Sequence, residues 1–234
     1  MIHLAGDDVL KRALEEIQIL EEEGVDGLII ENYHGKIEDV DLVLFHLQNF
    51  KGLLGLNILP NDYELALKLA EEYNADFIQL DYVAGTYNRT TSIDEQHFLS
   101  VRRKFLQERK DSEMEEIIIL GGIHPKYYIP VTNSILKDDI EIGMKRAEAI
   151  VVTGEGTGKE TPIEKIKEFR SIMGEHPLIV GAGLTPLTVQ QQLSVADGAI
   201  VGSTFKPHGI TTQKIQRSLV KEFMDEVKKV RNGI

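Results

Sequence analysis

Cysteine is absent from the 234-residue chain, and positive charge is scarce. Without cysteine there is no disulfide, no zinc–thiolate site and no thiol nucleophile, and a reducing compartment fits this composition. The 26 Lys and Arg residues against 38 Asp and Glu residues leave a formal net charge of -12. Because nonspecific nucleic-acid affinity comes mainly from clustered basic side chains, this balance argues against a nucleic-acid partner.

Long apolar runs are also missing. No run approaches the roughly 20 apolar residues of a membrane-spanning helix. The opening MIHLAGDDVLKRALEEI lacks the basic start and apolar stretch of a signal peptide. We therefore predict no membrane span and a cytoplasmic location. Hydrophobic residues still make up 42% of the chain, which is enough for an ordinary globular core.

Short apolar runs alternate with longer segments of helical period along the whole chain. Eight runs are typical of strands: IHLAG, VDGLIIEN, KGLLGLNIL, ADFIQLDYV, EIIILGGIH, EAIVVTG, PLIVGAGL and GAIVGSTF. They contain few charges and no strict alternation, which indicates parallel strands buried on both faces. Eight β-then-α units in this length favour a closed (β/α)8 TIM barrel over an open doubly wound sheet. No linker divides the chain, so residues 1–234 are predicted to form one domain.

Amphipathic helices are predicted between these runs, among them residues 9–23, 62–73, 163–173 and 188–193. Two of them carry start signals. Asn61 precedes one helix, and Thr161 is predicted to cap another, with Pro162 in its first position and Glu164 completing a capping box. The longest irregular stretch, residues 84–94, is predicted to be either a plain solvated loop or a lid over the site.

Polar side chains follow most of the predicted strands, at the ends where barrel enzymes carry their active sites. Strand alternation predicts that Gln79 shares a face with Asp81. By the same rule, His124 shares a face with Lys126. One such residue alone is more often structural than catalytic, but many polar groups around one barrel mouth would be costly to desolvate without a ligand or water. The full set is His3, Glu31, Asn32, Asn57, Gln79, Asp81, His124, Lys126, Thr153, Glu155 and Thr157.

Two glycine-rich turns, GAGLTP (residues 181–186) and GSTFKPHG (residues 202–209), follow the seventh and eighth predicted strands. Phosphate-binding barrels hold their anion at this place. Glycine lets backbone amides close on phosphate oxygens, and nearby hydroxyls add donors. One such turn could equally serve a tight connection, but two at consecutive strands favour phosphate binding. The predicted phosphate ligands are Gly181, Gly183, Thr185, Gly202, Ser203 and Thr204.

General acid–base chemistry is the reaction type that the side chains at the mouth favour. Glu31 and Asp81 are the candidates for the general base. His124 or His3 would act as the acid, and Lys126 would stabilise an enolate or form a Schiff base. Asn57 completes the predicted catalytic set.

A metal site is only weakly supported by the sequence. No tight spacing such as H-E-x-x-H is present, and no cofactor is predicted. The oligomeric state is open, and a homo-oligomer is compatible with the sequence. Suitable donor atoms for a divalent metal at the predicted mouth lie on Glu31, Asp81, His3 and His124.

The stretch VVTGEGTGKETP, residues 151–162, is similar to the P-loop of nucleoside triphosphatases. A P-loop needs G-x-x-x-x-G-K-[ST], but here three residues separate Gly154 from Gly158, and Glu160 occupies the Ser/Thr position. The predicted helix also begins after Lys159 rather than at it. The stretch therefore argues against a triphosphatase and is interpreted as a βα loop that forms one wall of the site.

Several blocks of the chain resemble the BtpA family of (β/α)8 barrels, which includes SgcQ-like proteins encoded near sugar-utilisation genes. The resemblance covers nearly the whole chain and is carried by EEGVDGLIIEN, GLNILPNDYELALKLAEEYNADFIQ, VVTGEGTGKETPIEKIKEFR, LIVGAGLTP and ADGAIVGSTFKPHG, with IHL near the start and HPK at residues 124–126. The family name comes from a role in accumulation of photosystem I. Its barrel is similar to phosphate-binding barrels that isomerise, epimerise, cleave or synthesise phosphorylated sugars and amino-acid precursors.

Some positions depart from the family pattern. The family usually follows its first strand with a proline-rich PLPG-type loop, whereas here residues 5–7, AGD, lead straight into a helix. Gly122 stands where an acidic residue is common, Gln79 where arginine is common and Asp81 where asparagine is common. Two hypotheses follow: an isomerase or lyase acting on a small phosphorylated metabolite, either a sugar phosphate or a nucleotide-derived compound, and a non-catalytic assembly factor.

Overall fold

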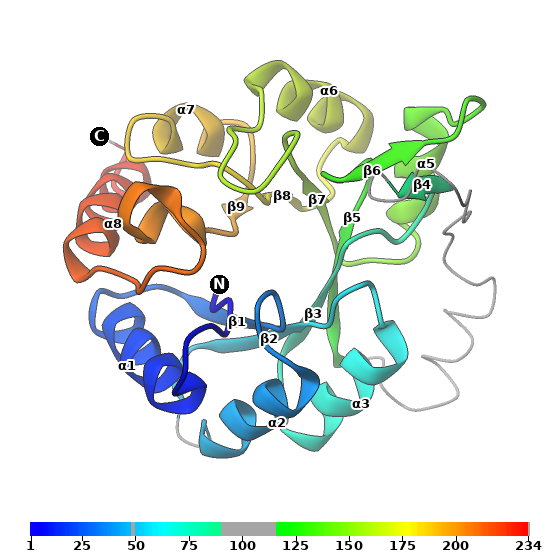
Figure 1. Cartoon of the computed structure of the whole chain (residues 1–234). Helices are drawn as coiled ribbons and strands as arrows, with labels where there is room; N and C mark the ends of the chain where they lie inside the picture. The colour runs from blue at the N-terminus through cyan, green and yellow to red at the C-terminus, as the bar shows by residue number, and fades with distance from the viewer. Residues whose placement is uncertain (48–49, 90–115, 234) are drawn as a thin grey trace.

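Helices surround a curled sheet in the computed structural model, which describes residues 1–47, 50–89 and 116–233 (Figure 1). Within those ranges, no helix has the length and apolar character needed to cross a membrane. The helices are α1 (Val9–Glu22), α2 (Ile37–His46), α3 (Tyr63–Glu72), α5 (Leu136–Gly143), α6 (Ile163–Met173), α7 (Val189–Leu193) and α8 (Arg217–Arg231), with 3-10 turns η2 (Ser203–Phe205) and η3 (Pro207–Gly209).

The sheet has seven strands in the order β1-β2-β3-β5-β7-β8-β9, and every neighbouring pair in it is parallel. The strand order follows the chain order because each strand is followed by a crossover that returns the chain to the same end of the sheet. The predicted parallel arrangement is therefore confirmed. The strands are β1 (Gly27–Glu31), β2 (Leu53–Asn57), β3 (Phe77–Leu80), β5 (Ile118–Gly122), β7 (Ala149–Val152), β8 (Leu178–Val180) and β9 (Gly198–Ala199).

The first of the eight predicted strands is not a strand. Ile2 forms an isolated parallel bridge with Ile30, and the nitrogen of Met1 donates a hydrogen bond to the Val201 carbonyl at 2.9 Å. Leu4 has a φ of 39°, which takes the chain out of the extended conformation directly afterwards. The segment thus touches both edges of the curled sheet, but among the described residues the sheet holds seven strands rather than eight.

Alternating side chains divide the core into two parts. Leu28 and Ile30 of β1 face the helices and belong to the large core cluster between sheet and helices. Ile29, between them, points the other way and packs with Val151 and Ile200 in a small apolar cluster inside the curl of the sheet. Because a strand reverses its side chains at every residue, the positions that follow this inner cluster also point inward.

Both predicted helix starts shift by one residue. Asp62, not Asn61, precedes α3, and its carboxylate accepts a hydrogen bond from an amide of the first turn. Pro162 precedes α6, and Thr161 does not cap the helix, since its hydroxyl donates to the Ala182 carbonyl at 3.0 Å. The predicted capping box at Thr161 is therefore wrong, because the hydroxyl bonds instead to Ala182, in the loop that follows β8.

A short antiparallel ribbon stands outside the main sheet. It pairs β4 (Tyr87–Arg89) with β6 (Tyr128–Pro130), which lie in the connections that follow β3 and β5. Residues 84–94 were expected to form an irregular loop, but their first part enters this ribbon. Residues 90–94 lie outside the described ranges, so the interpretation as a lid stays a prediction.

Acidic side chains at the starts of three strands fix the register of their neighbours. Each carboxylate accepts a hydrogen bond from a backbone amide of the preceding strand, which would otherwise be unpaired. A one-residue slip would break these bonds and turn the inward side chains outward. The bonds join Asp76 to the Leu54 amide at 2.7 Å, Glu148 to the Ile119 amide at 2.7 Å and Asp197 to the Leu178 amide at 2.8 Å.

Gly55 allows the ring of Phe77 to lie across β2. A Cβ atom at position 55 would stand 2.1 Å from Cε2 of that ring. We predict that Gly55→Ala lowers the free energy of unfolding by about 1–3 kcal/mol, because overpacking forces the ring to move. Urea denaturation measures the change. In a Phe77→Leu background the same substitution should cost much less, and an equal cost in both backgrounds would contradict the proposed clash.

Candidate functional site

Buried polar side chains follow the inner apolar cluster at the carboxyl ends of the strands. Glu31 ends β1 and lies in register with Asn57 at the end of β2, while Gln79 lies inside β3. All three are inward positions, and none is more than 9% exposed. The sequence thus correctly placed these residues together, but their chemical roles stay predictions.

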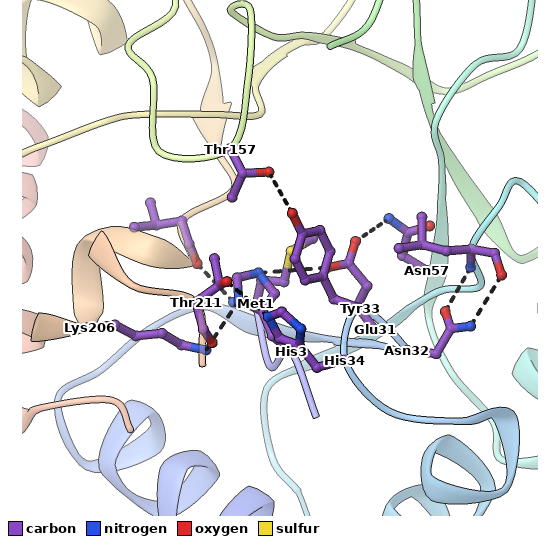
Figure 2. A network of polar contacts seen from close by, with 12 residues as sticks. Met1, His3, Glu31, Asn32, Tyr33, His34, Asn57, Thr157, Lys206 and Thr211 are labelled. Carbon is purple, nitrogen blue, oxygen red and sulfur yellow. Dashed lines mark hydrogen bonds and ion pairs between the residues drawn. The ribbon is translucent and has the colours of Figure 1, made fainter. Parts of the chain in front are cut away.

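Glu31 is the central charged group of this layer. Its Oε1 accepts a hydrogen bond from Nδ2 of Asn57 at 2.8 Å, and its Oε2 lies 3.6 Å from Nε2 of His3 (Figure 2). Burial raises the pKa of Glu31 to about 7, because the charged carboxylate loses its hydration, and the charge of Asp81 adds to the shift. The charge of Lys126 acts in the opposite direction.

Lys206 is a functional candidate that the sequence reasoning missed. Its side chain is only 2% exposed, and its Nζ lies 3.1 Å from Nδ1 of His3 and 2.8 Å from the Thr211 carbonyl oxygen (Figure 2). Burial lowers the pKa of Lys206 to about 8, and burial together with the neighbouring Lys206 lowers the pKa of His3 to about 2. The available signal was its place in GSTFKPHG, one of the two turns predicted to bind phosphate.

Tyr33 covers His3 from the side of the mouth. The two rings lie 5.0 Å apart between centroids, and the Tyr33 hydroxyl donates to Oγ1 of Thr157 at 3.3 Å (Figure 2). The amide of Thr157 in turn donates to the hydroxyl of Tyr127 at 2.9 Å. Three loops that follow different strands are therefore joined over the buried polar layer, and neither tyrosine was singled out from the sequence.

A small pocket joins the two glycine-rich turns to this layer. It is lined by five of the six predicted phosphate ligands, and also by His3, Lys126 and Thr157. Thr185 does not line it, because its hydroxyl lies 3.2 Å from that of Thr188 at the start of α7. The five lining residues of the turns are Gly181, Gly183, Gly202, Ser203 and Thr204.

Several main-chain amides around the pocket have no hydrogen-bond acceptor among the described residues. They belong to Gly183, Leu184, Gly202, Ser203 and Thr204. Gly183 has a φ of 71°, and a Cβ there would lie 2.1 Å from the Lys159 carbonyl oxygen. Glycine is therefore required where the loop of residues 153–162 folds against the first turn. Amides in this arrangement are suited to an anion.

His124 lies apart from the buried glutamate. Its Nε2 is 2.8 Å from Oδ2 of Asp139 on α5 and 3.1 Å from Oγ of Ser134. A φ of 45° ends the extended conformation at His124, so strand alternation no longer applies. Lys126 lines the small pocket instead. The prediction that His124 and Lys126 share a face is therefore wrong.

Other predicted mouth residues have structural contacts. The side-chain amide of Asn32 brackets Leu59, donating to its carbonyl at 3.1 Å and accepting from its nitrogen at 2.7 Å. Oγ1 of Thr153 accepts a hydrogen bond from the Lys126 amide at 2.8 Å. These bonds hold the loops that carry the site.

Two predicted carboxylates differ in their placement. Asp81 accepts a hydrogen bond from the Tyr128 hydroxyl at 2.8 Å and remains close enough to raise the pKa of Glu31. Glu155 does not reach the mouth, because its side chain is 87% exposed and lies 3.9 Å from Lys159. Strand β7 ends at Val152, so Glu155 lies in the following loop, where strand alternation does not direct its side chain.

Metal ligands do not cluster in the described parts of the chain: there, no group of three or more His, Asp or Glu side chains is arranged to hold an ion. His3 and Glu31 approach one another, but His124 lies with Asp139 on another side. The four donors considered from the sequence are thus not brought together as one set.

Comparison with known proteins places the chain in a family. The sequence profile of the BtpA family matches residues 46–229. The chain belongs to the BtpA family. This BtpA-family chain is 28% identical to an uncharacterized protein of Methanocaldococcus jannaschii, with 96% of this chain and 88% of the relative covered. It is 26% identical to the photosystem I biogenesis protein BtpA of Synechocystis, with coverages of 93% and 79%.

Solved structures similar to this BtpA-family chain have TIM-barrel-like folds. Phosphoribosyl anthranilate isomerase from Thermus thermophilus matches with a TM-score of 0.61 and 14% identity, covering 93% of this chain and 95% of that one. A native KDPGal structure matches with a TM-score of 0.65 and 12% identity, covering 95% and 91%. At these identities the likeness shows the fold alone.

The buried carboxyl of Glu31 makes a testable contribution to the pH dependence of stability. In the folded protein its pKa is about 7, against 4.5 for an ordinary glutamate. The fold thus binds this proton more tightly than the unfolded chain, and the contribution to stability is present below pH 4.5 and lost as the pH rises to 7. Across that interval Glu31 should lower the free energy of unfolding of the parent by on the order of 3 kcal/mol, and we predict that Glu31→Gln abolishes this decrease.

Chemical denaturation of parent and Glu31→Gln proteins between pH 4.5 and 7.5 measures this effect. The variant should gain stability relative to the parent as the pH rises. Glu155→Gln, which changes an exposed carboxylate, is the matched control and should give a curve parallel to that of the parent. A constant difference between Glu31→Gln and the parent would show that Glu31 titrates as an ordinary glutamate.

Proposed function

We propose that this BtpA-family protein is an enzyme that moves a proton at carbon in a small phosphorylated metabolite, such as a sugar phosphate or a nucleotide-derived compound. The observation that carries the proposal is the place of Glu31, a buried carboxyl with a pKa of about 7, beside a pocket where five main-chain amides find no acceptor among the described residues. A pKa near the working pH suits a general base. The amides suit a phosphate group.

The proposed reaction begins with loss of a proton from a carbon next to a carbonyl group. Glu31 takes the proton, and the electron pair of the broken C–H bond moves onto the carbonyl oxygen as an enolate. Lys126, which lines the pocket, would stabilise that oxygen. Return of the proton to the neighbouring carbon gives an isomer. Alternatively, the enolate electrons expel a leaving group, which gives lyase chemistry.

Two further features support a polar ligand at this place. The side-chain oxygens of Asn57 and Gln79 are buried without a hydrogen-bond partner among the described residues. Such oxygens cost free energy unless a donor reaches them, and the hydroxyl groups of a sugar are donors of this kind. The phosphate would be held by the amides of Gly183, Leu184, Gly202, Ser203 and Thr204, while Gly181 lines the pocket with its own amide bonded to the Val152 carbonyl at 2.8 Å. The contacts of Met1 and Ile2 with the two edges of the sheet would close the barrel around this site.

The fold is compatible with this chemistry. Phosphoribosyl anthranilate isomerase, one of the similar structures, acts on a phosphoribosyl compound by its name. This is an analogy of fold, which raises the plausibility of the reaction class without naming the substrate. A non-catalytic assembly role is the second candidate, and it is favoured by the name of the Synechocystis relative, a photosystem I biogenesis protein.

Phosphate binding is tested by placing a negative charge in the pocket. We predict that Ser203→Asp weakens the binding of sugar phosphates at least tenfold, because the new carboxylate repels the phosphate at close range. A panel of sugar phosphates and nucleotides is first screened with the parent protein by thermal shift, since a ligand of the native state raises the melting temperature. Calorimetry then compares the affinities of parent and variant.

Ser194→Asp is the matched control, because Ser194 is exposed at the end of α7 and away from the pocket. It should bind the same compound as tightly as the parent. Equal affinity in the Ser203→Asp protein would overturn the phosphate site. Failure of the parent to bind or convert any phosphorylated compound, or to exchange a carbon-bound proton with D2O in their presence, would favour the assembly role.

A further inference from the structure

We infer that Lys206 is a positioning residue that holds His3 with its proton on Nε2, so that a neutral N–H group faces the carboxylate of Glu31. The contacts run from Lys206 through both nitrogens of His3 to Glu31, and end at Asn57 (Figure 2). The arrangement of these bonds does not depend on a substrate. Its use in catalysis rests on the proposed function.

The hydrogen-bonding capacity of Lys206 determines the direction of the chain of contacts. An ammonium group has three N–H donors and no acceptor. Nζ of Lys206 donates to the Thr211 carbonyl at 2.8 Å and lies 3.1 Å from Nδ1 of His3, so Nδ1 must be the acceptor. In a neutral imidazole the other nitrogen then carries the proton.

Nε2 of His3 lies 3.6 Å from Oε2 of Glu31. This separation exceeds a hydrogen bond, so Nε2 faces Oε2 as a neighbouring donor rather than as a bonded one. The other carboxylate oxygen is already held by Asn57 at 2.8 Å. Glu31 therefore has one donor fixed on one oxygen and a second donor close to the other.

The imidazole ring has little freedom to turn over. Tyr33 lies against it with 5.0 Å between ring centroids. On another side, a Cβ atom at Gly202 would be only 3.0 Å from Nε2 and Cε1 of the ring. A flipped ring would lose the bond to Lys206 while staying in the same confined space, so the contacts favour one orientation.

The segment around Thr211, whose carbonyl accepts a hydrogen bond from Lys206, is itself held in place by α1. Arg12 donates to the carbonyl of Thr212 at 2.9 Å, next to Thr211, and Glu16 accepts a hydrogen bond from the Ile215 amide at 3.2 Å. Arg12 and Glu16 also form an ion pair at 2.8 Å. The segment that presents the Thr211 carbonyl to Lys206 is thus fixed independently of His3.

Burial keeps His3 neutral over the physiological range, as its pKa falls to about 2. The positive charges of Lys206, the amino terminus, Lys126 and His34 also disfavour a positive charge on the ring. His3 is therefore suited to donate a hydrogen bond to Glu31 rather than to act as an acid. This differs from the acid role that the sequence suggested for it.

Nitrogen NMR of the ligand-free full chain, labelled with 15N, tests the inference at pH 6.5. Long-range 1H–15N correlations distinguish a protonated ring nitrogen from an unprotonated one, and comparison with a His3→Gln protein assigns the His3 signals. We expect the parent to show protonated Nε2 and unprotonated Nδ1. The opposite tautomer, or a doubly protonated ring, would overturn the proposal without any variant of Lys206.

In the Lys206→Met protein, His3 should show a mixture of the two neutral tautomers. The Lys206→Arg protein keeps a cationic donor at this position and should show the same protonated Nε2 as the parent. Lys214→Met removes an exposed lysine paired with Glu15 and should leave the His3 signals unchanged. An unaltered tautomer in a folded Lys206→Met protein would show that Lys206 does not position the ring. Because no ligand is used, a failure of phosphate binding would leave this result interpretable.

Discussion

The burial of the Glu31 carboxyl is the constraint around which the rest of the site is arranged. Removing a carboxylate from water is costly, and the cost falls only if hydrogen bonds and nearby positive charges replace the lost hydration. Here Asn57 supplies one hydrogen bond, and Lys126 opposes the shift in pKa. Compensation is incomplete, since the pKa remains at about 7, and this leaves Glu31 able to gain and lose a proton near neutral pH.

The alternation of side chains along parallel strands connects this site to the core. Ile29 packs in the inner apolar cluster, and two residues later the same face carries Glu31. The register with β2 then brings Asn57 beside it. Acidic groups at the strand starts, such as Asp76, hold the register from the opposite end of the sheet. The functional layer is thus a continuation of the packing layer beneath it.

The glycine-rich turns and the polar layer meet because the first and last segments of the chain come together. His3 follows the bridge at Ile2, whereas Gly202 and Lys206 follow β9, and each of these two lies against His3 across the gap in the sequence. The loop that is similar to a P-loop lies against the other turn, with the Lys159 carbonyl close to Gly183. Its role in the fold is to enclose the pocket.

The sequence by itself determined the parallel sheet, the helix pattern, and the gathering of polar side chains such as Glu31 and Asn57 at one end of the sheet, because all of these follow from local periodicity and strand order. It also located the two turns that line the pocket. Only the tertiary structure decided that His124 turns to Asp139, that Glu155 points to solvent, and that Lys206 reaches His3. These outcomes depend on where a strand stops and on contacts between residues that are distant in the chain, such as His3 and Lys206, which lie 203 positions apart. Periodicity carries no information about either of these.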